Sequence, residues 1–307
     1  MQKFKIISRN SELALVQAAF VKEKISELYP ELDIEIIGIT TKGDKILNKS
    51  LDKIGGKGLF IKELEQELLK NNADLAVHSL KDLPVVTPDK FVIPAILKRY
   101  DPSDAFISNK YNRLEDMPDN SIIGTSSPRR IALLKKYFPQ LSVKLLRGNI
   151  QTRLARLDNG EFDGVILATA GIMRLGLEAR IKQKLDVNTF IPAIGQGALA
   201  LEILATRLDL LLLLNRLEDC DTYLTTLAEQ EVGRLVGASC NLPIGVYAQI
   251  SGQNMHMRVI IANNDTGKSC SVSLSDHKDN YSALAQKAVN QMASDGLSEI
   301  LASEKVI

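Results

Sequence analysis

Residues 121–149 read SIIGTSSPRRIALLKKYFPQLSVKLLRGN, and this stretch indicates the class of fold. SIIG has a strand pattern and leads into the residues TSS, whose hydroxyls can cap a helix. PRRIALLKKYF has helical spacing with Pro128 in the first turn, and SVKLLRGN has the pattern of a second strand. The stretch therefore predicts a β-α-β unit.

The first 40 residues show the same order of elements. KFKIIS alternates as a strand, Ser11 can cap the helix that follows, and DIEIIGIT has the pattern of the next strand. The match continues in order, because YPELDIEII resembles FPQLSVKLL and ADLAVHS resembles FDGVILA. We therefore expect an internal repeat that forms two related α/β domains.

Two apolar segments with proline and glycine breaks, residues 91–108 and 190–203, are suited to cross from the first domain to the second and back. A ligand cleft is then expected between the domains, at the carboxyl ends of the strands. Beyond the repeat, a helix, three short strands and a closing helix predict a small α+β domain with a three-stranded antiparallel sheet. The expected domains are residues 1–97 with 198–216, residues 98–197, and residues 217–307.

The composition is that of a globular protein with almost no net charge. Of 307 residues 45% are hydrophobic, and 38 basic residues against 37 acidic ones give a net charge of +1. We therefore expect neither nucleic acid nor membrane as a partner, and any anion site must be local. The N-terminus lacks an apolar signal core, and the longest apolar run, LDLLLLLNRL, is too short to span a bilayer, so a cytoplasmic location is expected.

The cysteines Cys220, Cys240 and Cys270 have neither CxxC spacing nor histidine partners. This pattern argues against a disulfide framework and against a zinc site, and we expect no bound metal. Cys240 lies in LVGASCNLPIG, where small residues and a Pro-x-Gly sequence predict a turn that leaves the thiol accessible. The alternative is a packing residue, since free cysteine is often buried.

Cations and hydroxyls recur where the predicted strands end. In TSSPRR, helix N-terminal amides, capping hydroxyls and two guanidiniums converge, a combination that favours a carboxylate ligand. A solvated helix start is the alternative for each arginine taken alone. The residues at these strand ends are Arg9, Ser11, Ser79, Lys81, Thr125, Ser126, Ser127, Arg129, Arg130, Arg147 and Arg153.

Asp82 is a carboxylate among these cations, on the turn SLKDLP after a buried strand. Nearby cations should keep it ionised, so that it could stabilise a cationic intermediate or pass a proton. The alternative is an ordinary ion pair with Lys81. His78, in the apolar run before the turn, is expected to be a hydrogen-bonded core residue. The segment GDKILNKSLDKIGGKGLF lacks the GxxxxGK[ST] order of a phosphate loop and is expected to form a mobile lid.

Long motifs cover almost the whole chain in a fixed order: SRNSELALVQA, GGKGLFIKELE, AVHSLKDLP, DPSDAFIS, GTSSPRR, LRGNIQTRL, LDNGEFDGVILATAG, PAIGQGALALE and CNLPIG. In this order they resemble the porphobilinogen deaminase family, also called hydroxymethylbilane synthases, of tetrapyrrole biosynthesis. The resemblance implies two periplasmic-binding-protein-like α/β domains and a small α+β domain. It also implies that Cys240 holds a dipyrromethane cofactor through a thioether.

The resemblance further implies a transferase that condenses four porphobilinogen molecules, starting on the cofactor, with loss of ammonia, and then releases hydroxymethylbilane by hydrolysis. Each pyrrole carries an acetate and a propionate, so the growing chain needs many cations. By matched position, Asp82 is the acid/base. Contacts with the cofactor are implied for Cys240, Lys81, Asp82, Ser127, Arg129, Arg130, Arg147 and Gly148. Contacts with the substrate are implied for Arg9, Ser11, Ser79, Thr125, Ser126, Arg153, Arg174 and Gln196, and a lid at residues 45–58 carries Lys53 and Lys57.

The chain departs from the family pattern at EIL (202–204), AEQ (228–230) and GAS (237–239), which leaves open how the third domain packs against the cleft. Two other hypotheses compete with the enzyme: a solute-binding protein for a small anion, and an inactive relative retained for interaction. The intact motifs SLKD, TSSPRR and CNLPIG favour an enzyme, which we expect to be a monomer.

Overall fold

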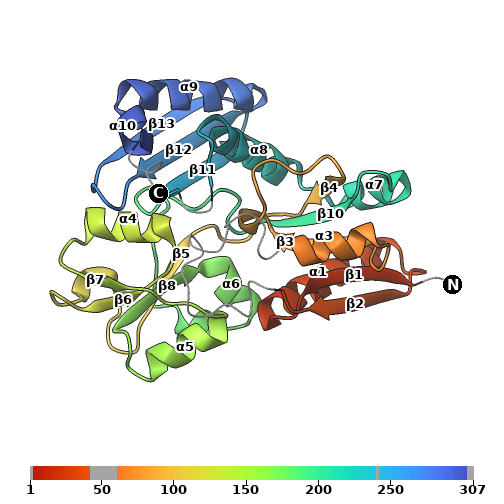
Figure 1. The fold of residues 1–307 in the computed structure, drawn as a ribbon, viewed down its shortest axis with the longest axis horizontal. Helices are drawn as coiled ribbons and strands as arrows, with labels where there is room; N and C mark the ends of the chain where they lie inside the picture. The colour runs from red at the N-terminus through yellow and green to blue at the C-terminus, as the bar shows by residue number, and fades with distance from the viewer. Residues whose placement is uncertain (1–2, 42–60, 240–241, 303–307) are drawn as a thin grey trace. The chain divides into compact units, whose positions relative to one another are not determined.

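The structure, a computed structural model, describes residues 3–41, 61–239 and 242–302. The chain forms two compact units (Figure 1). The first consists of Met1–Tyr100 and Gly197–Tyr223, and the second of Asp101–Gln196 and Leu224–Ile307. The division into three domains expected from the sequence stays a prediction. In the described part of the chain, no helix is long and apolar enough to cross a membrane.

The first unit contains a sheet of five strands: β1 (Phe4–Arg9), β2 (Ile34–Ile39), β3 (Leu75–Ser79), β4 (Phe91–Ile96) and β10 (Leu199–Leu204). Their order in the sheet is β2-β1-β3-β10-β4. β1 is parallel to β2 and β3, whereas β10 is antiparallel to β3 and β4. β10 follows the whole second repeat in sequence, so the chain returns to the first sheet as predicted.

Helices cover both faces of this sheet. Ile6 packs in one core with α1 (Glu12–Leu28) and α7 (Leu208–Leu214). Ile7 packs in another core with α3 (Lys62–Leu69). Because successive residues of a strand point to opposite faces, α1 and α3 lie on opposite sides of the sheet.

The second unit repeats this topology. Its strands are β5 (Asp104–Ile107), β6 (Ile122–Gly124), β7 (Ser142–Lys144), β8 (Gly164–Ala168) and β9 (Gln183–Lys184). Their order is β7-β6-β8-β5-β9; β6 is parallel to β7 and β8, and β5 is antiparallel to β8 and β9. The accompanying helices are α4 (Pro128–Tyr137), α5 (Ile150–Asp158) and α6 (Thr169–Arg174). The three parallel strands have the same order in both sheets, β2-β1-β3 and β7-β6-β8, with an antiparallel strand beside the third, which confirms the internal repeat.

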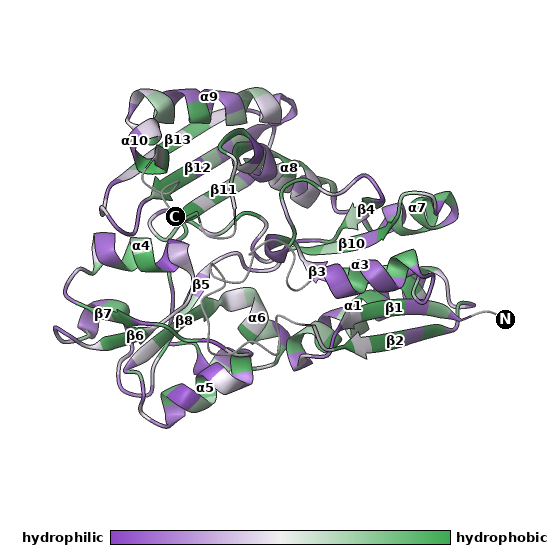
Figure 2. Ribbon diagram, viewed as in Figure 1, coloured by the Kyte–Doolittle hydropathy of each residue, from purple (hydrophilic) through white to green (hydrophobic). Residues whose placement is uncertain are grey.

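The C-terminal part of the second unit holds an antiparallel sheet in the order β11-β12-β13, with β11 (Ile244–Ser251), β12 (Asn254–Ala262) and β13 (Ser269–His277). Its core includes apolar residues of α8 (Cys220–Leu235), α9 (Tyr281–Ser294) and α10 (Leu297–Ala302). Figure 2 shows hydrophobic and hydrophilic residues alternating along α9, as expected for a helix with one buried face. These three sheets confirm the predicted fold class. Short 3-10 turns occur at η2 (Leu80–Asp82), η3 (Leu114–Asp116), η4 (Glu178–Arg180), η5 (Asn215–Leu217) and η6 (Lys278–Asn280).

Candidate functional site

The carboxyl ends of β1 and β3 carry the candidate residues of the first unit. Arg9 is the last residue of β1 and Ser79 the last of β3, and these strands are parallel neighbours. The turn η2 follows β3 directly and carries Lys81 and Asp82, both exposed. Arg9, Ser79, Lys81 and Asp82 therefore lie at one edge of the sheet, here called the first edge.

Hydrogen bonds from α1 support the first edge. Ser11 is the N-cap of α1, and its side chain accepts a hydrogen bond from the Ala14 N–H, with a donor–acceptor distance of 3.4 Å. Gln17, a buried residue of the same helix, donates from Nε2 to Ser79 Oγ at 3.0 Å. The sequence reasoning missed Gln17. Its only signal was an amide at a helix position whose neighbours are apolar.

The residues after β6 begin the candidate site of the second unit. Ser127 caps α4 and accepts from the Arg130 N–H at 3.4 Å. Ser126 Oγ donates to the Leu146 carbonyl at 2.6 Å, which ties the start of α4 to the segment after β7. Thr125 Oγ1 accepts from the Ser127 N–H at 3.3 Å. The three hydroxyls of the TSS sequence therefore fix the local backbone.

A buried carboxylate holds the two arginines of TSSPRR. Arg129 Nη1 lies 2.8 Å from Asp104 Oδ2, and Arg130 Nη2 lies 2.7 Å from Asp104 Oδ1. Arg129 also donates to the Ile191 carbonyl and Arg130 to the Ile166 carbonyl, at 2.8 and 2.9 Å. All three charged side chains are at most 7% exposed. The arginines are thus not an exposed helix start but part of a buried ion-pair network.

The charges of Asp104, Arg129 and Arg130 interact strongly. Burial raises the pKa of Asp104, but the charges of Arg129 and Arg130 outweigh burial and hold that pKa well below its usual range. Gln196 Nε2 adds a hydrogen bond to Asp104 Oδ1 at 3.0 Å. One carboxylate faces two guanidiniums, so the network keeps one net positive charge. The sequence reasoning missed Asp104, whose signal was a carboxylate within the apolar segment DAFI.

The chain leaves β7 at Lys144, earlier than the predicted strand SVKLLRGN ends. Further along, Gly148 has a φ of +107°, a left-handed conformation that favours glycine, so the extended strand predicted to reach residue 149 is also interrupted there. Arg153 Nε donates to the Gly148 carbonyl at 2.8 Å, and Arg147 and Arg153 are half-buried. α6 follows β8, the other parallel neighbour of β6, and ends at Arg174. The second edge, as the name is used here, consists of Thr125–Arg130, Arg147, Gly148, Arg153 and Arg174.

Several predicted roles fall outside the described residues. These are the attachment of a cofactor at Cys240 and the lid with Lys53 and Lys57. The other two cysteines are described: Cys220 is exposed at the start of α8, and Cys270 is buried in β13, where burial raises the pKa of its thiol.

Two buried glutamates lie in segments that depart from the family pattern. Glu202, in EIL, places Oε2 2.8 Å from His78 Nε2, which confirms His78 as a hydrogen-bonded core residue. Glu229, in AEQ, accepts hydrogen bonds from the backbone N–H groups of Gly195 and Ala248, at 2.8 and 2.9 Å. Glu229 therefore ties α8 to β11 and to the segment PAIGQGA.

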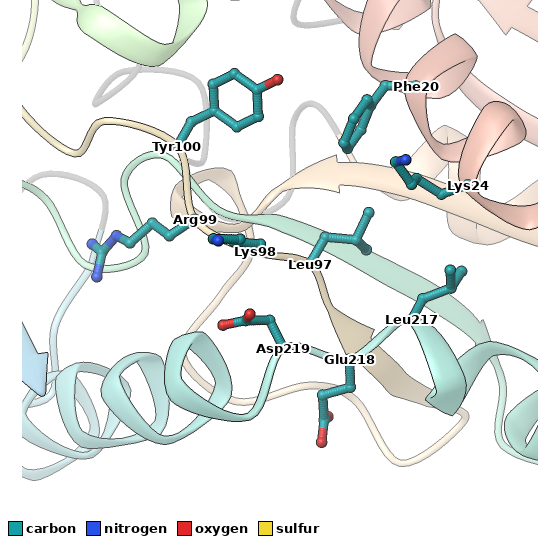
Figure 3. A pocket seen from close by; sticks show the side chains of 9 residues that line it. All are labelled: Phe20, Lys24, Leu97, Lys98, Arg99, Tyr100, Leu217, Glu218 and Asp219. Carbon is teal, nitrogen blue, oxygen red and sulfur yellow. The ribbon is translucent and has the colours of Figure 1, made fainter. Parts of the chain in front are cut away.

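A cavity of about 510 Å³ lies within the first unit (Figure 3). The rings of Phe20 and Tyr100 meet edge to face in its wall, with centroids 6.2 Å apart. Lys24, also in the wall, is paired with Glu27 at 2.7 Å. None of the predicted site residues lines this cavity. Its lining is Phe20, Lys24, Leu97, Lys98, Arg99, Tyr100, Leu217, Glu218 and Asp219.

Comparison with known proteins decides the family. Residues 4–211 match the family model "Porphobilinogen deaminase, dipyromethane cofactor binding domain", and residues 223–294 match "Porphobilinogen deaminase, C-terminal domain". The chain belongs to the porphobilinogen deaminase family. A porphobilinogen deaminase from Chromobacterium violaceum is 47% identical over 303 residues, which cover 99% of this chain and 98% of the relative. One from Neisseria meningitidis serogroup B is 44% identical over 300 residues, which cover 98% and 96%.

Solved structures with a similar course of the chain are more distant. The methionine-binding protein MetQ is 13% identical with a TM-score of 0.44, and the match covers 76% of this chain and 94% of MetQ. The periplasmic VFT2 domain of BvgS from Bordetella pertussis is 17% identical with a TM-score of 0.41, over 70% of this chain and 86% of that domain. The fold assignment of this porphobilinogen deaminase family member therefore rests on its own strand order.

Proposed function

We propose that this chain is a transferase that condenses four porphobilinogen molecules head to tail, with release of ammonia, and hydrolyses the product to hydroxymethylbilane in tetrapyrrole biosynthesis. The observation that carries this proposal is the match to porphobilinogen deaminases along nearly the whole chain. The reaction starts on a dipyrromethane cofactor, the group named by the family model. The intact motifs SLKD, TSSPRR and CNLPIG support an active enzyme.

The second edge fits a cofactor that is rich in carboxylates. Guanidiniums, hydroxyls and backbone N–H groups are the donors that carboxylates accept. Arg129 Nε is buried and has no hydrogen-bond partner among the described residues, so a donor remains beside the network with Asp104. When bound, the dipyrromethane supplies the free pyrrole carbon at which the chain grows. The residues proposed to hold it are Cys240 through a thioether and Lys81, Asp82, Ser127, Arg129, Arg130, Arg147 and Gly148.

The remaining polar residues of the two edges, together with Ser11 and Gln196, are proposed to bind the incoming substrate and the growing chain. Each added pyrrole brings an acetate and a propionate, and charge-assisted hydrogen bonds from arginine neutralise such groups with fixed geometry. The residues proposed for this role are Arg9, Ser11, Ser79, Thr125, Ser126, Arg153, Arg174 and Gln196. Lys53 and Lys57 are proposed to belong to a lid over residues 45–58.

Asp82 is the proposed acid/base. It lies on an exposed turn beside Lys81, so its carboxylate can reach a ligand at the first edge. A negative charge there would stabilise the cation that the substrate becomes when ammonia leaves. The same carboxylate would then accept the proton that each new link releases.

The proposal also covers the location, assembly and partners of the enzyme. We place the enzyme in the cytoplasm as a monomer, and its net charge of +1 supports the proposal that it binds no nucleic acid and no membrane. The three-domain division, with residues 217–307 carrying the cofactor, is part of the same proposal.

The intact mass of freshly purified protein tests the function. Protein made in cells that produce porphobilinogen should exceed the mass of the bare chain by two pyrrole units and colour with an acidic aldehyde reagent. Cys240→Ala should abolish both signals and product formation, whereas the control Cys220→Ala should keep them. A bare chain mass together with absence of hydroxymethylbilane synthesis would favour a solute-binding protein or an inactive relative.

A further inference from the structure

The strand that leads to Asp82 has a pair of interacting polar side chains at each end. At its amino end, Oδ1 of Asp74 lies 2.9 Å from Arg207 Nη1. At its carboxyl end, His78 Nε2 lies 2.8 Å from Glu202 Oε2. His78 belongs to β3 and Glu202 to β10, whereas Asp74 directly precedes β3 and Arg207 follows β10. The two pairs therefore hold opposite ends of the β3–β10 pairing.

The pair at the carboxyl end is more deeply buried than the other. The side chains of His78 and Glu202 are 5% and 1% exposed, whereas those of Arg207 and Asp74 are 33% and 23% exposed. Ala200 is opposite His78 in the strand register, so Glu202 is the diagonal neighbour of His78 on the same face. The pairing of β10 with β4 is irregular at Glu202, and such irregularities re-aim a side chain.

A second carboxylate, that of Glu65, lies on the helix that covers the same face of the sheet, and its charge interacts with this pair. Glu65 belongs to α3, and burial raises the pKa of Glu65, with the charge of Glu202 adding to the rise. His78 opposes this rise. Removing the imidazole would therefore leave Glu202 buried near another carboxylate and without its hydrogen-bond partner, so the local packing would have to change.

We propose that the His78–Glu202 pair positions Asp82 for the reaction. Only a short turn separates His78 from Asp82, and the Leu80 N–H of that turn donates to the Ala198 carbonyl at 3.0 Å. The turn is thus an extension of the β3–β10 pairing that the buried pair holds in register. Small displacements of a reacting group lower the rate even when every binding group remains. His78 acts through the backbone and does not touch the substrate, and this inference rests on the proposed function.

His78→Leu tests the proposal, with Arg207→Leu as the matched control at the other end of the strand. His78→Leu should lower kcat by roughly 10- to 100-fold, while the cofactor mass increment and KM stay near those of the parent. Arg207→Leu should lower the melting temperature yet keep kcat within about twofold, because the amino end of β3 is far along the chain from the turn. His78→Gln can still donate to Glu202 and should restore most of kcat.

Two results overturn the proposal: a cofactor-loaded His78→Leu protein with the kcat of the parent, or an equal loss of kcat in Arg207→Leu. If His78→Leu does not fold, the double variant His78→Leu with Glu202→Leu carries the test, because it leaves no unpaired buried charge. Its kcat should fall likewise, and a parental kcat in the double variant counts against positioning. Failure of the proposed function can be distinguished from failure of the positioning proposal, since the parent itself would then show neither the mass increment nor hydroxymethylbilane.

Discussion

The first and second edges share the order of their parallel strands but place their carboxylates differently. At the first edge, Asp82 is exposed on a turn after the central strand β3. At the second edge, Asp104 is buried between Arg129 and Arg130. The repeated sheet therefore supplies two equivalent scaffolds, one presenting a carboxylate and the other fixing cations. We interpret the first as the edge for chemistry and the second as the edge for holding anionic groups.

The largest effect should come from removing the charge at the first edge. Asp82→Asn keeps shape and hydrogen bonding but loses the charge, and kcat should fall by about 10²- to 10⁴-fold with an unchanged melting temperature. Asp82→Glu keeps the charge on a longer arm and should retain the cofactor and part of the turnover. Hydroxymethylbilane release measured beside thermal melting checks both variants. An ordinary ion pair with Lys81 predicts the reverse: near-normal turnover and a small loss of stability.

At the second edge, stability should respond most to the buried carboxylate. Asp104→Leu leaves Arg129 and Arg130 buried without a counter-charge, and the free energy of unfolding in urea should fall by about 3–5 kcal/mol. The exposed pair of Lys110 with Asp163 in the same unit provides a control, because Lys110→Ala should leave that free energy close to the parent value. A change in Asp104→Leu no larger than in the control would contradict the burial argument.

The pH dependence of stability gives a smaller effect with a defined sign. The pKa of Asp104 is lower in the folded protein than its value of about 3.9 in an unfolded chain. Its contribution is therefore fully present above that value and is lost as the pH falls through the folded pKa. The difference in unfolding free energy between the parent and Asp104→Asn should be constant near neutrality and should shrink below about pH 4. Urea unfolding at a series of pH values measures it, and a difference that does not change with pH would count against the assignment.

The smallest effects should be equal at the two edges. Ser11 and Ser127 cap the equivalent helices α1 and α4 with the same 3.4 Å hydrogen bond. Ser11→Ala and Ser127→Ala should each lower the free energy of unfolding by about 1 kcal/mol, and the corresponding glycine variants by only a few tenths. Clearly unequal losses in chemical denaturation would show that the repeat does not extend to its helix caps.

Local sequence patterns were sufficient to predict the repeat, the caps at Ser11 and Ser127 and the core position of His78, since periodicity and capping act over a few residues. The partners Asp104 and Gln17 could not be predicted, because each meets its partner only after distant segments pack together. Asp104 lies 25 residues before Arg129, at a sequence separation where pattern reasoning offers no pairing rule. The early end of β7 was missed because the apolar pattern of SVKLLRGN continues past Lys144, where the pairing with β6 ends.

The most direct test of the division between the two edges is the intact mass of the Asp82→Asn protein, sampled over time after porphobilinogen is added. Our account predicts that this protein already carries the cofactor increment, because Cys240 and the cations proposed to hold the cofactor remain and the asparagine keeps the hydrogen-bonding capacity of residue 82. Substrate units should then add far more slowly than in the parent, with hydroxymethylbilane release reduced in proportion. Addition and release at the rate of the parent would contradict the assignment of chemistry to Asp82 and, with it, the functional difference between the edges.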